Sequence, residues 1–159
     1  MGKVNDIFGN EIEFKCMGCD IAGHKLVPPG GYIYEDDLVN ISADPEIPIV
    51  GFVVLGISKH VKSMNELTRD DRIHIMDVLN TTIENMKHAD ICKEVLLIQE
   101  ERASHLHVWI VPIHEWMEEF DKSVTNIREI IEYSNKNFDE KTKEDLLNAI
   151  ESLKAEFKK

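Results

Sequence analysis

The sequence predicts an α+β fold in which an antiparallel sheet of about five strands carries one long helix and extra C-terminal helices. Three observations support this: short apolar runs joined by tight turns, one long helical pattern among them, and helical spacing of apolar residues toward the C-terminus. Strands that follow one another through short turns are typical of an antiparallel sheet, whereas alternating strands and helices would predict a parallel one. A chain of 159 residues suits a single domain.

The first part of the chain is expected to hold a hairpin signal and three strands. Gly9-Asn10 indicates a turn or a short hairpin, and strands are expected at 32–34 and 38–42. Residues 49–57 read Ile-Val-Gly-Phe-Val-Val-Leu-Gly-Ile, which is nearly all apolar. Such a run predicts a strand in the middle of the sheet.

A long helix is expected after Thr68, which forms a capping pair with Asp71. Its apolar residues recur at spacings of three and four, which predicts one buried face: Ile73, Met76, Leu79, Ile83 and Met86. Strands at 94–100 and 105–111 follow, and two more helices are expected at 115–134 and 141–157.

Residues 105–111, His-Leu-His-Val-Trp-Ile-Val, carry the strongest functional signal in the chain. In a strand, successive side chains point to opposite faces, so Leu106, Val108 and Ile110 form an ordinary core stripe. The other face carries His105, His107 and Trp109. Two imidazoles at this spacing reach into one small space, where histidine serves as base, nucleophile or metal ligand. The alternative is a pair of half-exposed histidines on an edge strand.

The cysteines predict a metal site. Cys16 and Cys19 form a C-x-x-C pair, which in a reducing compartment is half a zinc site or a redox motif. A redox motif would follow a strand and open a helix, but this pair precedes a loop rich in Gly and Pro. His60 ends the strongest strand and His105 starts another, so a Cys₂His₂ zinc site forms if these ends meet.

Charge and hydropathy exclude several classes of partner. The net charge of -12 argues against a nucleic-acid polymer, because binding to phosphate backbones depends on clustered Lys and Arg. A small nucleotide is not excluded, since a few amides and one cation can hold it. No apolar run approaches the ~18 residues of a membrane span, and the first residues lack an apolar signal region. We therefore expect a cytoplasmic protein that does not enter a membrane.

Taken together, these motifs resemble the histidine triad (HIT) superfamily of nucleotidyl hydrolases and transferases. The family's strand reads His-φ-His-φ-His-φ-φ, where φ is apolar, and residues 105–111 are similar. A bacterial branch similar to diadenosine polyphosphate hydrolases shows four further elements in the same order: C-x-x-C at 16–19, Tyr-Glu-Asp-Asp at 34–37, Asp44-Pro45 and Lys59-His60. The resemblance covers roughly residues 14–117 of one HIT-like domain spanning 1–159. The C-terminal helical extension, about 118–159, falls outside it.

The resemblance implies a role for each matching residue. His107 corresponds to the nucleophile that attacks the α-phosphate of a nucleoside phosphate derivative, such as a dinucleoside polyphosphate or a phosphoramidate, and forms a covalent nucleotidyl-histidine. Asp44 corresponds to the acidic residue that holds the ribose hydroxyls, although a simple Asp-Pro turn is the alternative. Cys16, Cys19, His60 and His105 correspond to the ligands of a structural zinc ion. The family also implies a homodimer whose sheets join across the interface.

The chain departs from the family at the third histidine, which is Trp109. Its indole N–H is a donor and could replace the imidazole, or the ring could wall the pocket for a base. The usual polar contacts before the motif are missing as well. In their place, Arg102 is the natural cation for a phosphate and Ser104 could donate a hydrogen bond. A solvated turn is the alternative for Arg102.

Three other functions compete with nucleotidyl transfer or hydrolysis. The first is a non-catalytic nucleotide-binding or regulatory protein, because the triad is incomplete. The second is a hydrolase with catalytic zinc, in which His105 and His107 both hold an open metal site. The third is a redox role for the Cys16–Cys19 pair.

Overall fold

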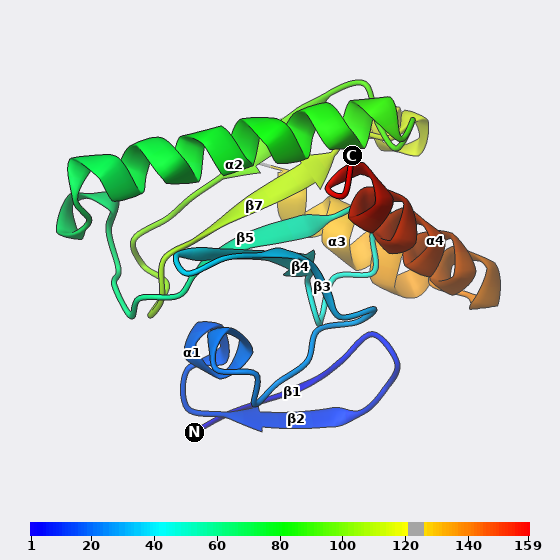
Figure 1. Cartoon of the computed structure of the whole chain (residues 1–159). Coiled ribbons are helices and arrows are strands. Elements are labelled where there is room, and N and C mark those ends of the chain that lie inside the picture. The colour runs from blue at the N-terminus through cyan, green and yellow to red at the C-terminus, as the bar shows by residue number, and fades with distance from the viewer. Residues whose placement is uncertain (121–125) are drawn as a thin grey trace.

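The computed structural model describes residues 1–120 and 126–159, and this part of the chain forms two antiparallel sheets with helices around the larger one (Figure 1). The larger sheet has five strands in the order β3-β4-β5-β7-β6. Their bounds are β3 Tyr32–Glu35, β4 Val39–Ala43, β5 Val53–Ile57, β7 His107–Pro112 and β6 Val95–Ile98. All neighbouring strands pair antiparallel, so the predicted α+β fold class is confirmed.

The larger sheet carries helices on both faces (Figure 1). Helices α2 (Arg69–His88) and α4 (Glu140–Glu156) cover one face, where the main core includes Ile41, Leu55 and Ile110. Helix α3 (Ile127–Lys136) packs on the other face, against a second core around Phe52 and Val111. The core stripe predicted for β7 is confirmed, since Leu106, Val108 and Ile110 are buried.

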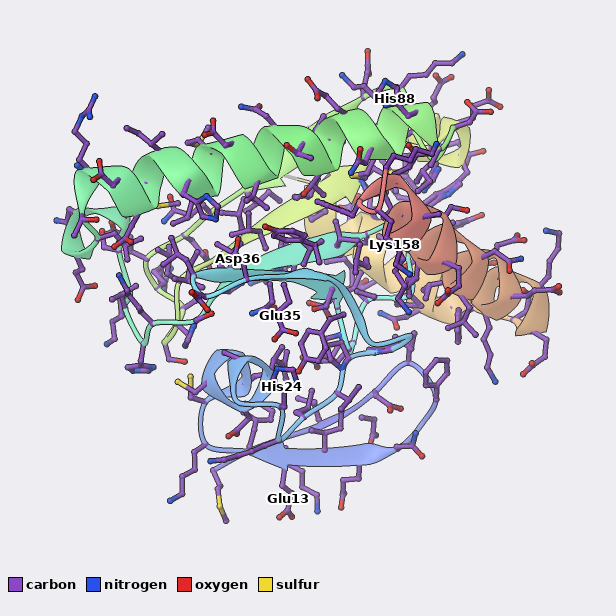
Figure 2. The ribbon with its side chains drawn as sticks, viewed as in Figure 1. Glu13, His24, Glu35, Asp36, His88 and Lys158 are labelled. Carbon is purple, nitrogen blue, oxygen red and sulfur yellow. The ribbon has the colours of Figure 1, made fainter. Side chains whose placement is uncertain are left out.

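The N-terminal unit lies across the sheet from α2 and consists of a hairpin and a short helix (Figure 1). Strands β1 (Gly2–Asn5) and β2 (Glu11–Phe14) form the hairpin, and Gly9 adopts a φ of 83° in its turn, as the sequence predicted. Helix α1 (Met17–Ala22) follows. Below β3, His24 pairs with Glu35 at 2.6 Å, which links this unit to the sheet (Figure 2).

The predicted strand at 49–57 is wrong in its first half, because β5 begins only at Val53. Residues 49–52 form a turn in which the Phe52 N–H donates to the Ile49 carbonyl at 3.0 Å. Gly51 allows this turn, since its φ is +76° and a β-carbon there would collide with Ile91. Here backbone geometry overrides the apolar pattern.

The long helix is confirmed, but its buried face was predicted incorrectly in the N-terminal half. Thr68 and Asp71 form the expected capping box. Leu79 and Met86 are buried, whereas Ile73 and Met76 are 43% and 48% exposed. The true buried face is one position away at that end: Ile75, Val78, Leu79, Thr82, Asn85 and Met86.

The predicted helix at 115–134 is interrupted. Glu115–Glu119 forms a 3-10 helix, Phe120 after it is extended, and α3 begins only at Ile127. Val124, which was expected on this helix, lies outside the described residues. The helix expected at 141–157 is confirmed as α4, and a second short 3-10 helix spans Met64–Glu66. Among the described helices, none is long and apolar enough to cross a membrane.

Candidate active site and metal centre

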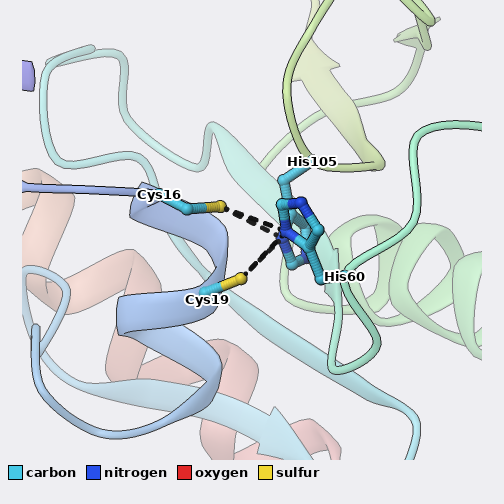
Figure 3. Close-up of side chains that lie close together, drawn as sticks. All are labelled: Cys16, Cys19, His60 and His105. Atoms are coloured by element: carbon cyan, nitrogen blue, oxygen red, sulfur yellow. Dashed lines mark hydrogen bonds between the residues drawn. The ribbon is translucent and has the colours of Figure 1, made fainter. Parts of the chain in front are cut away.

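Two cysteines and two histidines from distant parts of the chain meet beside helix α1 (Figure 3). Their four ligand atoms, the sulfurs of Cys16 and Cys19 and the ring nitrogens of His60 and His105, all lie within 4.8 Å of one another. The sulfur to Nδ1 separations are 3.0–3.6 Å. A tetrahedral zinc ion with ordinary Zn–S and Zn–N bonds would hold such atoms about 3.5 Å apart. The four predicted ligands therefore fit a zinc site.

The surroundings of His105 keep its ring in the form that a metal requires. Its Nε2–H donates to the Ile57 carbonyl at 2.6 Å, which leaves Nδ1 unprotonated and directed at the sulfurs. Burial lowers the pKa of His105, so the ring stays neutral near pH 7. Gly18 packs directly on this ring, since a β-carbon there would lie 2.5 Å from its Cγ. Helix α1 is thus fitted closely to the metal centre.

The local context of the C-x-x-C pair differs from the sequence expectation. The pair does follow a strand, β2, and it does open a helix, α1, which is the context expected of a redox motif. The metal interpretation depends instead on His60 and His105, which complete a set of four ligands. Burial, together with the neighbouring Cys16, raises the pKa of Cys19 to about 11. A cation between the sulfurs would offset this cost of forming thiolates.

A cavity of about 240 Å³ opens beside the metal centre. Its floor is the sheet face that carries Gly56, His107 and Trp109, and its far side is formed by β2 and α1. The residues that line it are Phe14, Met17, Gly18, Ile21, Asn40, Ser42, Ala43, Asp44, Pro45, Glu46, Val54, Gly56, Ala103, Ser104, His105, His107 and Trp109. Five of the residues predicted from sequence therefore share one hollow: Asp44, Ser104, His105, His107 and Trp109.

His107 is half-buried at this cavity and lies outside the metal cluster. Its Nδ1–H donates to the backbone carbonyl of His105 at 2.9 Å. A carbonyl can only accept, so the proton is on Nδ1 and the lone pair of Nε2 is free. A neutral imidazole with a free Nε2 is a competent nucleophile.

Asp44 makes the Asp-Pro turn that was the alternative prediction, and it also borders the cavity. One carboxylate oxygen accepts hydrogen bonds from the backbone N–H groups of Glu46 (2.7 Å) and Ile47 (3.1 Å), which makes the Asp-Pro turn. The side chain also lines the cavity. Burial raises the pKa of Asp44, although the two N–H groups and nearby His107 partly oppose this. In the part of the chain that the structure describes, the second carboxylate oxygen accepts no hydrogen bond.

The remaining candidates are divided between the cavity and solvent. Trp109 packs edge-on against Phe52, with ring centres 5.5 Å apart, and its ring centre is 6.2 Å from that of His107. Ser104 lines the cavity, but Arg102 is exposed and is not among the lining residues. Glu101 turns away and accepts a hydrogen bond from Ser63, which removes one carboxylate from the neighbourhood of a bound phosphate.

Sequence reasoning missed Asn40 and Ser42, two buried polar residues of β4 that line the cavity. They alternate with Val39 and Ile41 in the strand predicted at 38–42, to which no functional residue was assigned. The usable signal was their place beside the most apolar strand, since a strand inside the sheet has little solvent-facing surface.

No family model matches the chain, and no curated protein sequence matches it either. Solved structures do match in fold. A hypothetical histidine triad nucleotide-binding protein from Sulfolobus tokodaii is 21% identical, with a TM-score of 0.62 over 88% of this chain and 93% of that one. A zinc-bound histidine triad family protein from Mycobacterium smegmatis is 15% identical, with a TM-score of 0.60 over 89% and 96%.

A HIT family hydrolase from Legionella pneumophila is 15% identical, with a TM-score of 0.51 over 64% of this chain and 95% of that one. At such identities, the comparisons establish the fold. The chain thus has the histidine triad fold, with a Cys₂His₂ cluster suited to zinc next to a cavity that contains His107.

Proposed function

We propose that the protein is a nucleotidyl hydrolase or transferase that acts at the α-phosphate of a nucleoside phosphate derivative, with His107 as nucleophile. The observation that carries this proposal is the hydrogen bond from His107 Nδ1 to the His105 carbonyl, which leaves Nε2 free at the cavity. Dinucleoside polyphosphates and nucleoside phosphoramidates are the substrate classes that we expect.

The reaction proceeds in two displacements. Nε2 of His107 forms a bond to the α-phosphorus while the bond from phosphorus to the leaving group breaks. The leaving group departs with that electron pair and takes a proton from solvent. Water or an acceptor phosphate then attacks the phosphorus, the P–N bond breaks, its electrons return to Nε2, and the proton of an attacking water is released.

Other residues of the cavity position the substrate. Asp44 accepts hydrogen bonds from the ribose hydroxyls through its unused carboxylate oxygen. Trp109 takes the place of the third histidine, and its indole N–H donates to a phosphate oxygen. Ser104 adds a hydroxyl donor at the cavity edge. Arg102 remains the predicted cation, reaching the phosphates from its exposed turn.

Zinc is structural in this proposal. Four protein ligands complete a tetrahedral site, which leaves no open position for a substrate or a catalytic water. Cys16, Cys19, His60 and His105 would hold the ion, and it would tie α1 to the sheet. This closed ligand set favours a structural ion over the alternative in which His105 and His107 share a catalytic one.

A homodimer and a cytoplasmic location belong to the same proposal, as does a single domain over the whole chain. Sedimentation velocity on the purified protein measures its oligomeric state. A monomer at micromolar concentration would contradict the proposed homodimer.

The experiment that tests the function compares the wild type with His107→Ala on a dinucleoside polyphosphate. We expect the variant to lose at least about a thousandfold in kcat while keeping its zinc. Acid-quenched wild type should also contain labelled nucleotide bound to protein, and His107→Ala should contain none. Equal turnover by both proteins would exclude the mechanism, and binding without turnover by either would favour a non-catalytic nucleotide-binding protein.

A further inference from the structure

A second cavity, with a volume of about 280 Å³, also borders His107. His107 and Trp109 line both this cavity and the one beside the metal centre, so the two cavities meet at these side chains. Strand β7 lies between β5 and β6 in the sheet. The first cavity extends from β7 over β5 and β4, where Asp44 lies, and the second extends toward Ile98 of β6. The proposed nucleophile therefore has a separate space on each side.

Helix α3 forms the wall of the second cavity opposite the sheet. It packs on the sheet face that carries Trp109, opposite α2 (Figure 1), and Ile127, Ile130 and Ile131 make this contact. Ile127 and Ile131 also line the cavity. Because Arg128 directly follows the first of these isoleucines and lines the same cavity, its side chain reaches the cavity from the helix layer.

Arg128 brings a positive charge close to His107. Among the described residues that line the two cavities, it is the only lysine or arginine. It is exposed, and it has no hydrogen-bond or ion-pair partner in the part of the chain that the structure describes. Arg102, the cation predicted from sequence, lines neither cavity. A guanidinium presents a planar fork of N–H donors that binds a phosphate group through two hydrogen bonds.

The layers of the fold agree with the geometry of a displacement at phosphorus. In an in-line displacement, the leaving group lies on the side of the phosphorus away from the attacking atom. His107 belongs to the sheet, and Arg128 belongs to the helix layer that covers the same face. A phosphorus atom over Nε2 of His107 would therefore have its leaving group directed from the sheet toward this layer.

We propose that the second cavity binds the leaving group and that Arg128 binds its phosphate. The inference rests on the proposed function, which puts the α-phosphorus at His107. When the bond from this phosphorus to the leaving oxygen breaks, the electron pair stays on the oxygen, and the leaving phosphate gains one negative charge. The guanidinium of Arg128 stabilises that charge as it develops. Arg128 is then a specificity-determining residue that favours polyphosphate substrates over phosphoramidates.

An amine leaving group has a different charge and would not benefit from Arg128. When a P–N bond breaks, the nitrogen keeps the electron pair, takes a proton from solvent and departs as an uncharged or cationic amine. Glu100 lines the same cavity, and its carboxylate repels a leaving phosphate but not an amine. Arg128 and Glu100 should therefore affect turnover of a polyphosphate in opposite directions.

The test measures kcat/KM of the zinc-loaded full chain on a diadenosine polyphosphate and on the phosphoramidate of adenosine monophosphate with an alkylamine. Both substrates transfer the same adenylyl group to His107, so they differ in the leaving group. We expect Arg128→Gln to lower kcat/KM about 10- to 100-fold for the polyphosphate and less than about twofold for the phosphoramidate. Lys136→Gln is the matched control, because it removes one positive charge from the last turn of α3, outside both cavities, and it should change neither value.

Glu100→Gln gives a test of the opposite sign. We expect it to raise kcat/KM for the polyphosphate about threefold, because it removes a negative charge next to the leaving phosphate. It should not raise kcat/KM for the phosphoramidate. A gain confined to one substrate is not expected of a residue with a merely structural role.

Each outcome decides the question. A loss in Arg128→Gln that is confined to the polyphosphate supports the proposal. An equal loss on both substrates overturns it, because Arg128 would then act on the transferred group, and unchanged values overturn it as well. A wild type that turns over only the phosphoramidate overturns it and leaves the proposed function intact. If wild type turns over neither substrate, the proposed function fails and this inference with it. Zinc content and Tm identify misfolded variants, and Glu100→Gln keeps the test decisive if Arg128→Gln does not fold.

Discussion

His105 and His107 are two residues apart in the sequence, yet their side chains have different hydrogen-bond partners and different neighbours. Both ring nitrogens of His105 are engaged, one by the Ile57 carbonyl and one by the sulfurs of Cys16 and Cys19. Within residues 1–120 and 126–159, the only ring nitrogen of His107 with a partner is Nδ1, and the residue borders a cavity. The number of partners, rather than residue type or position in sequence, distinguishes the fully engaged ring of His105 from the ring of His107, which can still bind a ligand.

His105 also links the two regions directly. Its ring belongs to the metal centre, while its backbone carbonyl accepts the hydrogen bond that fixes the tautomer of His107. The metal centre and the cavity should therefore respond differently to substitution, and each of the following changes tests that difference.

The largest effect should come from Cys19→Ser, which removes one ligand of the metal centre. We expect loss of zinc and a fall in Tm on the order of 10 °C, because a structural zinc site contributes directly to folding. Atomic absorption and thermal denaturation measure the two quantities. Cys92→Ala is the matched control, since Cys92 is buried in the main core and outside the cluster, and it should keep its zinc. An unchanged Tm with lost activity would point to catalytic zinc.

Asp36→Asn should act on stability alone. Burial opposes ionisation of Asp36, but hydrogen bonds from Leu38, Val39, His74 and Tyr34 outweigh it and lower its pKa to about 2. Because the folded pKa lies below the unfolded one, the stabilisation is present above pH 4 and is lost as the pH falls toward 2. The variant should lose about 2 kcal/mol of unfolding free energy at pH 7.

Urea denaturation at several pH values measures the difference between wild type and Asp36→Asn. That difference should shrink steadily below pH 4. Zinc content and nucleotide affinity should stay the same, because Asp36 connects the β3–β4 turn to α2, away from the cavity. A difference that is constant with pH would mean that the carboxylate charge contributes nothing.

Trp109→Phe tests whether the indole is a donor or only a wall. The variant keeps an aromatic ring against Phe52 and loses the N–H. A hydrogen bond to a charged phosphate is worth enough that we expect kcat to fall about tenfold, with little change in KM. Steady-state kinetics on a dinucleoside polyphosphate measures both. An unchanged kcat would assign the ring to the pocket wall.

The smallest effect should come from Gly56→Ala. The new methyl group would press on the Asn40 amide, at 3.0 and 3.1 Å, and displace it by a few tenths of an ångström. We expect the affinity for AMP, measured by calorimetry, to fall about threefold, because the displaced amide lines the cavity. In an Asn40→Leu background, the same change should have no additional effect on that affinity, because the amide is already absent. Full additivity of the two changes would contradict this coupling.

The fold and the metal ligands could be predicted from the sequence, because local periodicity marks the strands and helices and short motifs in a fixed order mark the ligands. The alternation in 105–111 indicated which side chains share a face, and Thr68 with Asp71 marked the start of α2. The first half of the strand at 49–57 was wrong because the conformation of Gly51 is not encoded in hydropathy. Ile73 and Met76 were misassigned because the buried face of the helix is shifted there and runs through Ile75 and Val78.

The floor of the cavity was beyond local patterns. The strand register brings Asn40 and Ser42 to the cavity. It pairs them with Gly56 and Val54 of β5, which pair in turn with His107 and Trp109 of β7. Register depends on tertiary packing and cannot be read from one strand. Arg102 is the opposite case. Its type and its place next to the motif suggested a phosphate contact, but its side chain lies on an exposed turn.

Helix α1 and its N-cap residue contribute both to the metal centre, through Cys16 and Cys19, and to the cavity wall, through Met17 and Ile21. Because one short segment takes part in both sites, binding at one site is coupled to binding at the other. If a bound ion changes the affinity for a nucleotide by some factor, a bound nucleotide changes the affinity for the ion by the same factor. Under the proposed function, a positive coupling would mean that zinc starvation lowers the affinity for nucleotide and that abundant nucleotide slows the loss of zinc to competing chelators.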